Sequence, residues 1–111
     1  MTILTKAEEI LLLTILRLKD DAYGTTILRE IKGRTGKDLT IGSLWVSLDL
    51  LHKQGLIAKR VADEPPARGG RRKIYYTLTP DGIEALQNDR ELQKVLWRGA
   101  ARLLKSSGEV R

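Results

Sequence analysis

The 111-residue chain contains no cysteine and no long apolar run. Without cysteine, neither a disulfide framework nor a thiolate metal site can form, and a reducing compartment is compatible with the composition. The longest apolar run, Ile10–Leu13, is far shorter than the roughly 20 residues that cross a bilayer, and the N-terminus lacks a charged-then-apolar export signal. The sequence therefore predicts a cytoplasmic protein without a membrane segment.

The chain is also poor in residues that could act as catalysts or metal ligands. His52 is the only histidine, and a lone histidine lies in solvent more often than it binds a metal. Asp20, Asp21 and Glu64 fit turns and loops better than a role as general acids, because no base or nucleophile accompanies them. We therefore expect no enzyme activity, no cofactor and no metal.

Acidic residues are fewer than basic ones, 14 against 20, which gives a formal net charge of +6 and a pI of about 9.8. Such a surplus favours an anionic partner, most often nucleic acid, although it also serves solubility or binding to membrane surfaces. The length allows one hydrophobic core. The sequence therefore predicts one small, basic domain.

The first half of the chain predicts three helices. Thr5 and Glu8 fit a capping box, which starts a helix over 7–18. A second helix is predicted over 22–34, before a glycine that can end it, and a third over 41–54.

In the third helix, Thr40 is the predicted N-cap, and Leu44, Leu48 and Leu51 recur at spacings of four and three. These three leucines should face the core.

Two strands follow, over 56–63 and 73–79, with a proline- and glycine-containing loop over 64–70 between them. Side chains alternate along a strand, so two sets should point to opposite faces. The inner set is Ile74, Tyr76 and Leu78; the set facing solvent or nucleic acid is Lys73, Tyr75 and Thr77.

A long fourth helix is predicted over 80–105, with a frayed tail over 106–111. Its apolar seam is too long for a body of three helices and a hairpin to bury, which favours a homodimer. The expected fold class is α+β, mostly α: a winged helix-turn-helix with a two-stranded wing and a long C-terminal dimerisation helix. Residues 1–79 would form the DNA-binding domain, and residues 80–111 the dimerisation helix and tail.

The predicted DNA-binding residues fall into two groups. Those at the start of the third helix, off its leucine stripe, would meet base edges and phosphates, although the small ones could instead allow close helix crossing, and the tryptophan could be partly core. Those at the hairpin tip would contact phosphates or the minor groove, although a charge run is often only a solvated loop. The residues are Thr40, Ser43, Trp45 and Ser47, and then Arg68, Arg71, Arg72, Lys73 and Tyr75.

Several blocks, in the same order, resemble the PadR family of bacterial transcriptional regulators across nearly the whole chain. They are Ala22-Tyr23-Gly24, Ile41-Gly42-Ser43-Leu44-Trp45-Val46-Ser47-Leu48, Gly55-Leu56-Ile57, Gly69-Gly70-Arg71-Arg72-Lys73 and Tyr75-Tyr76-Thr77-Leu78-Thr79-Pro80-Asp81-Gly82. The resemblance implies a homodimeric winged-helix repressor whose third helix enters the major groove and whose wing lies along the backbone. A single C-terminal helix looks like the small multidrug-sensing branch.

Trp97 lies in the middle of the predicted dimerisation helix, where it could face its symmetry mate and form a slot for a flat aromatic effector. It could equally be a seam residue that only buries area. The favoured function is a sequence-specific, ligand-responsive repressor that binds double-stranded DNA as a homodimer. The alternative is a winged-helix protein-interaction module without a DNA target of its own.

Overall fold

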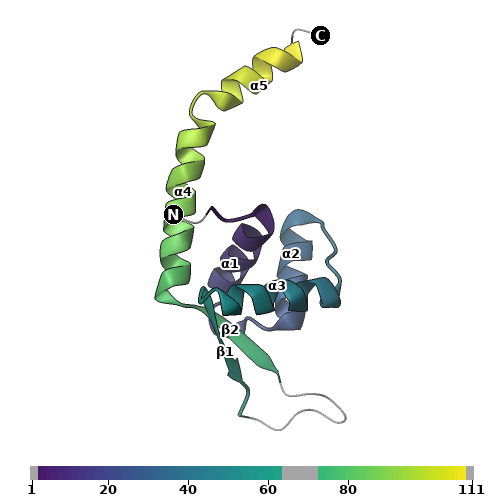
Figure 1. Ribbon diagram of the computed structural model, residues 1–111. Coiled ribbons are helices and arrows are strands. Elements are labelled where there is room, and N and C mark those ends of the chain that lie inside the picture. The colour runs from purple at the N-terminus through teal and green to yellow at the C-terminus, as the bar shows by residue number, and fades with distance from the viewer. Residues whose placement is uncertain (1–2, 64–72, 110–111) are drawn as a thin grey trace.

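The computed structural model describes residues 3–63 and 73–109. In chain order its elements are α1, a short 3₁₀ helix η1, α2, α3, β1, β2, α4 and α5. The first three α-helices form a body from which the hairpin and the last two helices project in different directions (Figure 1). The predicted wing residues Arg68, Arg71 and Arg72 lie outside the described residues.

The helices α1 (Lys6–Leu18) and α2 (Gly24–Thr35) form the first part of the body. The Thr5 hydroxyl accepts from the Glu8 backbone N–H at 3.1 Å, and the Glu8 carboxylate accepts from the Thr5 N–H at 2.7 Å. The predicted capping box is thus confirmed. After the 3₁₀ helix η1 (Lys19–Asp21), helix α2 begins two residues later than predicted, because Ala22 and the N-cap Tyr23 are extended.

Helix α3 (Ile41–Lys53) crosses the other two and completes the core. Its predicted N-cap is confirmed, because the Thr40 hydroxyl accepts from the Ser43 N–H at 3.1 Å. The three leucines of the predicted inward stripe are each 1% exposed. Burial of each such side chain stabilises the fold by roughly 1.5–3 kcal/mol. The largest fully buried side chains are Leu12, Ile15, Ile27, Leu44, Leu48, Leu51 and Ile57.

The strands β1 (Ile57–Val61) and β2 (Ile74–Leu78) pair antiparallel, so the predicted hairpin is confirmed with shorter strands than expected. The predicted alternation is also confirmed. Tyr76 is 4% exposed and joins the core, whereas Lys73 is exposed and Tyr75 is half-buried on the opposite face.

The C-terminal part is two helices rather than one. Helix α4 (Pro80–Trp97) ends before Gly99, which has φ +78°, a left-handed conformation that glycine adopts without steric cost. The chain bends there and continues as α5 (Ala100–Glu109). The prediction of one continuous helix over 80–105 is therefore wrong. So is the frayed tail predicted from residue 106, because α5 includes it as far as Glu109.

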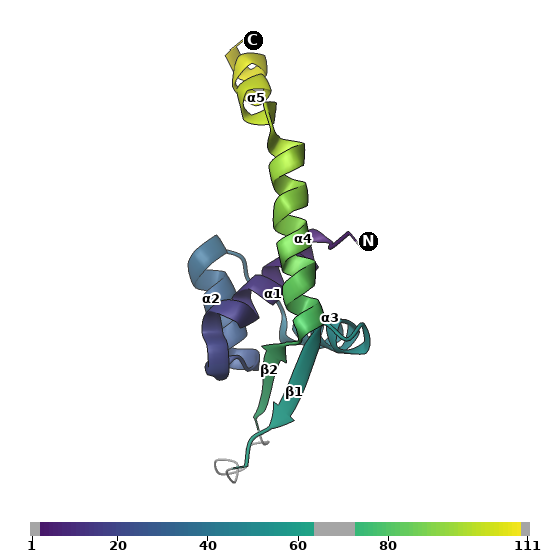
Figure 2. The ribbon, with the colours of Figure 1, turned by 90° about the vertical axis from the view of Figure 1, so that its left-hand side faces the viewer.

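Helix α4 packs against the body through its N-terminal part, as far as Asp89. Leu86 is 9% exposed, and Asp89, 7% exposed, shares a hydrogen bond with Glu9 of α1. The second half of α4 and all of α5 extend away from the body in both views (Figures 1 and 2). The described chain therefore measures 60 × 30 × 21 Å along its principal axes. None of the helices in its described part is long and apolar enough to span a membrane.

Candidate nucleic-acid interface

The predicted contact residues of α3 lie on both flanks of its buried stripe. Ser43 and Ser47 line a cavity of about 110 Å³ between α3, α1 and α2, where Ser47 is half-buried. Trp45 lies on the other flank, toward the hairpin, with its ring centroid 6.5 Å from that of Tyr76. The structure thus separates the two serines from the indole. It places Thr40 at the helix start, where the hydroxyl oxygen caps the helix and the O–H can still donate.

The side of α3 that points away from the core carries Gly42, Val46 and Leu50. Residues four apart share one face of a helix, and these three are offset from the buried leucines. Val46 is 63% exposed and Leu50 is 52% exposed. Sequence reasoning missed this line, although the spacing of the leucine stripe already implied it.

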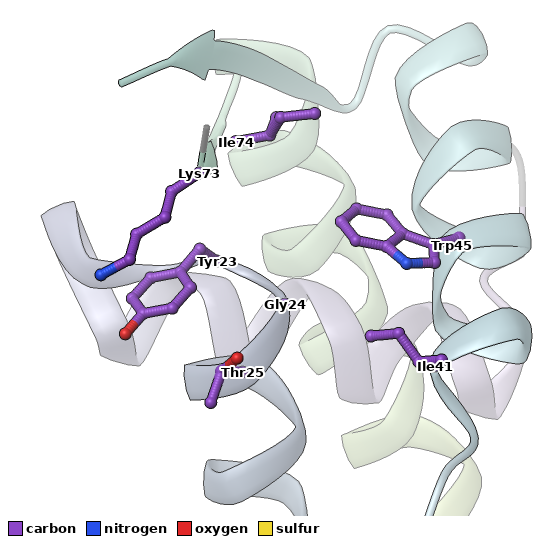
Figure 3. A pocket seen from close by; sticks show the side chains of 7 residues that line it. All are labelled: Tyr23, Gly24, Thr25, Ile41, Trp45, Lys73 and Ile74. Atoms are coloured by element: carbon purple, nitrogen blue, oxygen red, sulfur yellow. The ribbon is translucent and has the colours of Figure 1, made fainter. Parts of the chain in front are cut away.

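Trp45 forms one wall of a pocket of about 390 Å³ between α3, α2 and the hairpin (Figure 3). The indole and the Ile41 side chain come from α3, and the Tyr23 ring and the Lys73 chain lie on the opposite wall. A Cβ added at Gly24 would lie 3.6 Å from the indole, which is ordinary van der Waals contact. The pocket is therefore a hollow at the junction of helix-turn-helix and wing, walled by aromatic rings with a cation at its edge.

Two cations of the hairpin are held against aromatic rings beside this pocket. The Lys73 ammonium lies 4.5 Å from the centroid of the Tyr23 ring, and the Arg60 guanidinium lies 4.7 Å from that of Tyr75. The two tyrosine rings meet edge to face at 5.4 Å. Such cation–π contacts are worth roughly 0.5–1 kcal/mol at exposed sites, so they restrain the charges without neutralising them.

Tyr23 and Arg60 were not predicted as site residues. Arg60 pairs with Tyr75 across the two strands, which places both on the outer face of the hairpin. Tyr23 reaches them from the start of α2, a tertiary contact that no local pattern encodes. The strand register was the one signal that could have identified Arg60.

The charges on α3 itself largely cancel. Asp49 accepts from the Lys53 ammonium at 3.0 Å, and this hydrogen bond lowers the pKa of Asp49. The nearby phenol of Tyr76 is affected mainly by burial, which raises its pKa. The helix itself therefore carries little net charge, and the cations Lys73 and Arg60 come from the hairpin.

Trp97 lies far from this surface, at the bend between α4 and α5. It is 53% exposed and lines a hollow of about 410 Å³. The other lining residues are Gln93, Leu96, Ala100, Leu103, Leu104 and Ser107. His52 is half-buried beside Lys59 and Tyr76. Within residues 3–63 and 73–109, no group of three or more histidine or acidic side chains could hold a metal ion.

Comparison with known families decides the identity of this fold. The model of the transcriptional regulator PadR-like family matches residues 12–88, from α1 to the first half of α4. The chain belongs to the PadR-like family. Its fold is accordingly a winged helix-turn-helix, mostly helical, with a two-stranded antiparallel sheet as the wing.

Solved structures agree with this assignment. A PadR family transcription regulator from Clostridium difficile is 30% identical, with 89% of this chain and 95% of that chain covered and a TM-score of 0.62. Regulators from Bacillus cereus and Eggerthella lenta show the same fold. The first is 20% identical, covers 88% of this chain and 90% of that one, and has a TM-score of 0.71. The second is 23% identical, covers 88% and 83%, and has a TM-score of 0.70. No curated protein matches the sequence. This PadR-like chain is thus a transcriptional regulator whose fold supports DNA binding.

Proposed function

We propose that this PadR-like regulator is a cytoplasmic, homodimeric repressor that binds specific DNA sequences with α3 in the major groove and the wing along the phosphate backbone. The observation that carries the proposal is the surface formed by the exposed side of α3, the pocket of Trp45 and the cations Lys73 and Arg60. In such complexes, cations on phosphates set the affinity and position, and groove contacts set the sequence. At the start of α3, the hydroxyl groups of Thr40 and Ser43 would donate hydrogen bonds to the phosphate backbone of the DNA.

Removal of the two hairpin cations tests the proposed DNA surface. The double variant Arg60→Ala/Lys73→Ala takes about four phosphate contacts from a dimer, so the slope of log affinity against log salt should fall in magnitude by about 3 to 4. Anisotropy of a labelled duplex between about 50 and 200 mM salt measures the slope. Arg102→Ala/Lys105→Ala on α5 is the matched control, because it removes the same charge elsewhere. Equal slopes for the two variants would contradict the proposed surface.

The homodimer is proposed to form through α4 and α5. The exposed apolar side chains on the last turns of α4 and on α5 belong to a segment that extends away from the body (Figures 1 and 2), and a second copy would bury them. Those more than half exposed are Val95, Leu96, Trp97, Leu103 and Leu104. In this scheme residues 1–79 serve DNA binding and residues 80–111 serve dimerisation, although α4 also anchors to α1 through Leu86.

A charge placed in the hollow beside Trp97 tests the dimer. Leu103→Glu should raise the dimer dissociation constant at least about 100-fold, because burying an unpaired carboxylate costs several kcal/mol. Ser106→Glu adds the same charge on α5 outside the hollow and should leave the mass in solution unchanged. Sedimentation equilibrium separates the outcomes. A wild-type chain that is monomeric at micromolar concentration would overturn the dimer.

Trp97 is the proposed effector contact. In a dimer, two hollows of about 410 Å³ with an indole in each wall would offer a slot for a planar hydrophobic molecule. Such a molecule would release DNA only if it bound better to a dimer geometry in which the two α3 helices no longer match half-sites about 34 Å apart. The regulation is therefore a difference in affinity for two dimer geometries.

Tryptophan fluorescence tests the effector site. Planar cationic dyes should quench the wild type and Trp45→Ala, and should lose most of that effect on Trp97→Ala. Unaltered quenching in Trp97→Ala would place the dye elsewhere. The rival function, a module that binds acidic proteins, is distinguished by the DNA experiment, because it predicts no salt-sensitive affinity for any duplex.

A further inference from the structure

One line on the outward side of α3 is apolar and exposed, and the paired charges of Asp49 and Lys53 lie beside it. Gly42, Val46 and Leu50 follow one another at intervals of four residues, and Val46 is 63% exposed. Ile41, 50% exposed, extends the apolar surface toward the pocket of Trp45. None of these residues belongs to the core of the described chain. Water therefore covers apolar side chains at the centre of the surface proposed to meet DNA.

Helix α3 offers few side chains that could read a base through paired hydrogen bonds. It contains no arginine, asparagine or glutamine, and Lys53 is its one lysine; these four residue types bind guanine and adenine edges in a bidentate manner. Its outward carboxylate, Asp49, is paired with Lys53 at 3.0 Å, which engages both charges. Discrimination by direct polar contact from this helix is consequently weak.

Gly42 adds an independent observation. A Cβ at this position would meet nothing within 4 Å, and its backbone is an ordinary part of the helix. The fold of the chain does not require glycine here, although glycine in a helix costs roughly 0.5–1 kcal/mol relative to alanine. A glycine that the chain itself does not need leaves room for the close approach of another molecule.

We propose that α3 reads thymine, through contact of Val46 and Leu50 with the C5-methyl groups in the major groove. The inference rests on the proposed function, since it requires α3 to enter that groove. Thymine is the base that presents an apolar group there, and apolar side chains are its natural partners. Gly42 would let the first turn of the helix approach the duplex. The neighbouring cations Lys73 and Arg60 favour a nucleic acid as the occupant over an apolar protein surface.

The experiment removes methyl groups from the DNA. Duplexes are first enriched on the wild-type dimer from a random-sequence library long enough for two half-sites. The best of them is then made with deoxyuridine in place of single thymidines, which deletes the C5-methyl and leaves the hydrogen-bonding edge intact. At one or more positions in each half-site, the wild type should lose about fourfold in affinity per methyl removed, the value of one buried carbon.

Two variants assign the effect to the helix. Val46→Ser should bind the thymidine duplex more weakly and lose most of its sensitivity to deoxyuridine. Val61→Ser makes the same change at a similarly exposed valine, 54% exposed on β1, and should keep the sensitivity of binding to deoxyuridine. Both positions are on the surface, so both variants should fold, which circular dichroism checks.

The outcomes are distinct. An enriched duplex to which the wild type binds equally well with and without the methyl groups would overturn thymine reading and leave DNA binding in place. Enrichment of guanine and cytosine at every position of the half-sites would do the same. No enrichment of any duplex would overturn both the inference and the proposed function.

Discussion

Gly82 fixes the junction between the wing and α4, and its replacement by alanine should be strongly destabilising. A Cβ at this position would overlap the Leu56 carbonyl oxygen and lie 3.1 Å from its carbonyl carbon. The backbone there cannot move freely, because the same oxygen accepts from the Thr79 N–H at 3.1 Å. The Thr79 hydroxyl in turn donates to the Gly55 carbonyl at 2.6 Å and accepts from the Gly82 N–H at 3.1 Å.

The magnitude follows from these contacts. Overpacking against fixed atoms costs about 3 kcal/mol. Alanine gains at most about 1 kcal/mol from helix propensity, so the net loss for Gly82→Ala is about 2 kcal/mol or more. For a chain of this size that corresponds to a fall in Tm of about 8 °C.

Gly33→Ala is the matched control for this prediction. Gly33 lies inside α2, and a Cβ there would meet nothing within 4 Å. The same chemical change should therefore stabilise the protein by about 0.5–1 kcal/mol. Thermal unfolding followed by circular dichroism measures both variants. If Gly82→Ala unfolds at or above the wild-type temperature, the close approach of α4 to the wing base is not as described.

Three further predictions concern α1, the wing and the bend. The hydrogen bond between the two carboxyl groups raises the pKa of Asp89 and lowers that of Glu9. The stability that Asp89 contributes is thus complete below its unfolded pKa of about 4 and falls as pH rises through its folded pKa. Asp89→Asn should therefore have a higher Tm than the wild type at about pH 7.5 and lose this difference at about pH 4. A difference in Tm that grows on acidification would contradict the pairing. Tyr23→Ala removes the ring between Lys73 and Tyr75 and should weaken DNA binding by about threefold to tenfold with little change in the salt slope, since the charges remain; a slope change as large as that of Lys73→Ala would show that the ring does more than position the cation. Gly99→Ala disfavours the left-handed conformation at the bend by about 1–2 kcal/mol. The chain has no cysteine, so spin labels can be attached at Asn88→Cys and Ser107→Cys, and the distance between them should increase in the Gly99→Ala variant. An unchanged distance would mean that packing rather than Gly99 sets the bend.

Much of the fold was predictable because its signals are local. The capping box of α1, the leucine stripe of α3 and the alternation of Tyr75 and Tyr76 each depend on residues within a few positions of one another. The bend at Gly99 was missed because no local signal in the sequence distinguishes it from the middle of a helix. A single glycine inside an amphipathic run is tolerated in many helices, and the apolar seam continues on both sides of it.

The candidate site was predicted in part. The helix and the wing were identified, and the structure places Lys73 and Trp45 at one pocket. Their contact with DNA stays a prediction. The separation of Ser43 from Trp45 follows from the helical turn, and it became evident only once the neighbours of α3 were known. The contact of Tyr23 with the wing joins residues far apart in the sequence, and therefore depends on the packed structure.

The central claim is that a dimer binds DNA through the wing and α3 of both subunits. Its most direct test is the composition of the complex that the regulator forms with an enriched duplex. Sedimentation velocity with a labelled duplex should show two chains per duplex at about 100 mM salt. If each of the two subunits neutralises about four phosphates, log affinity should fall against log salt with a slope of roughly −7. A complex of one chain per duplex, or an affinity that does not respond to salt, would contradict a dimer that grips the backbone with two wings.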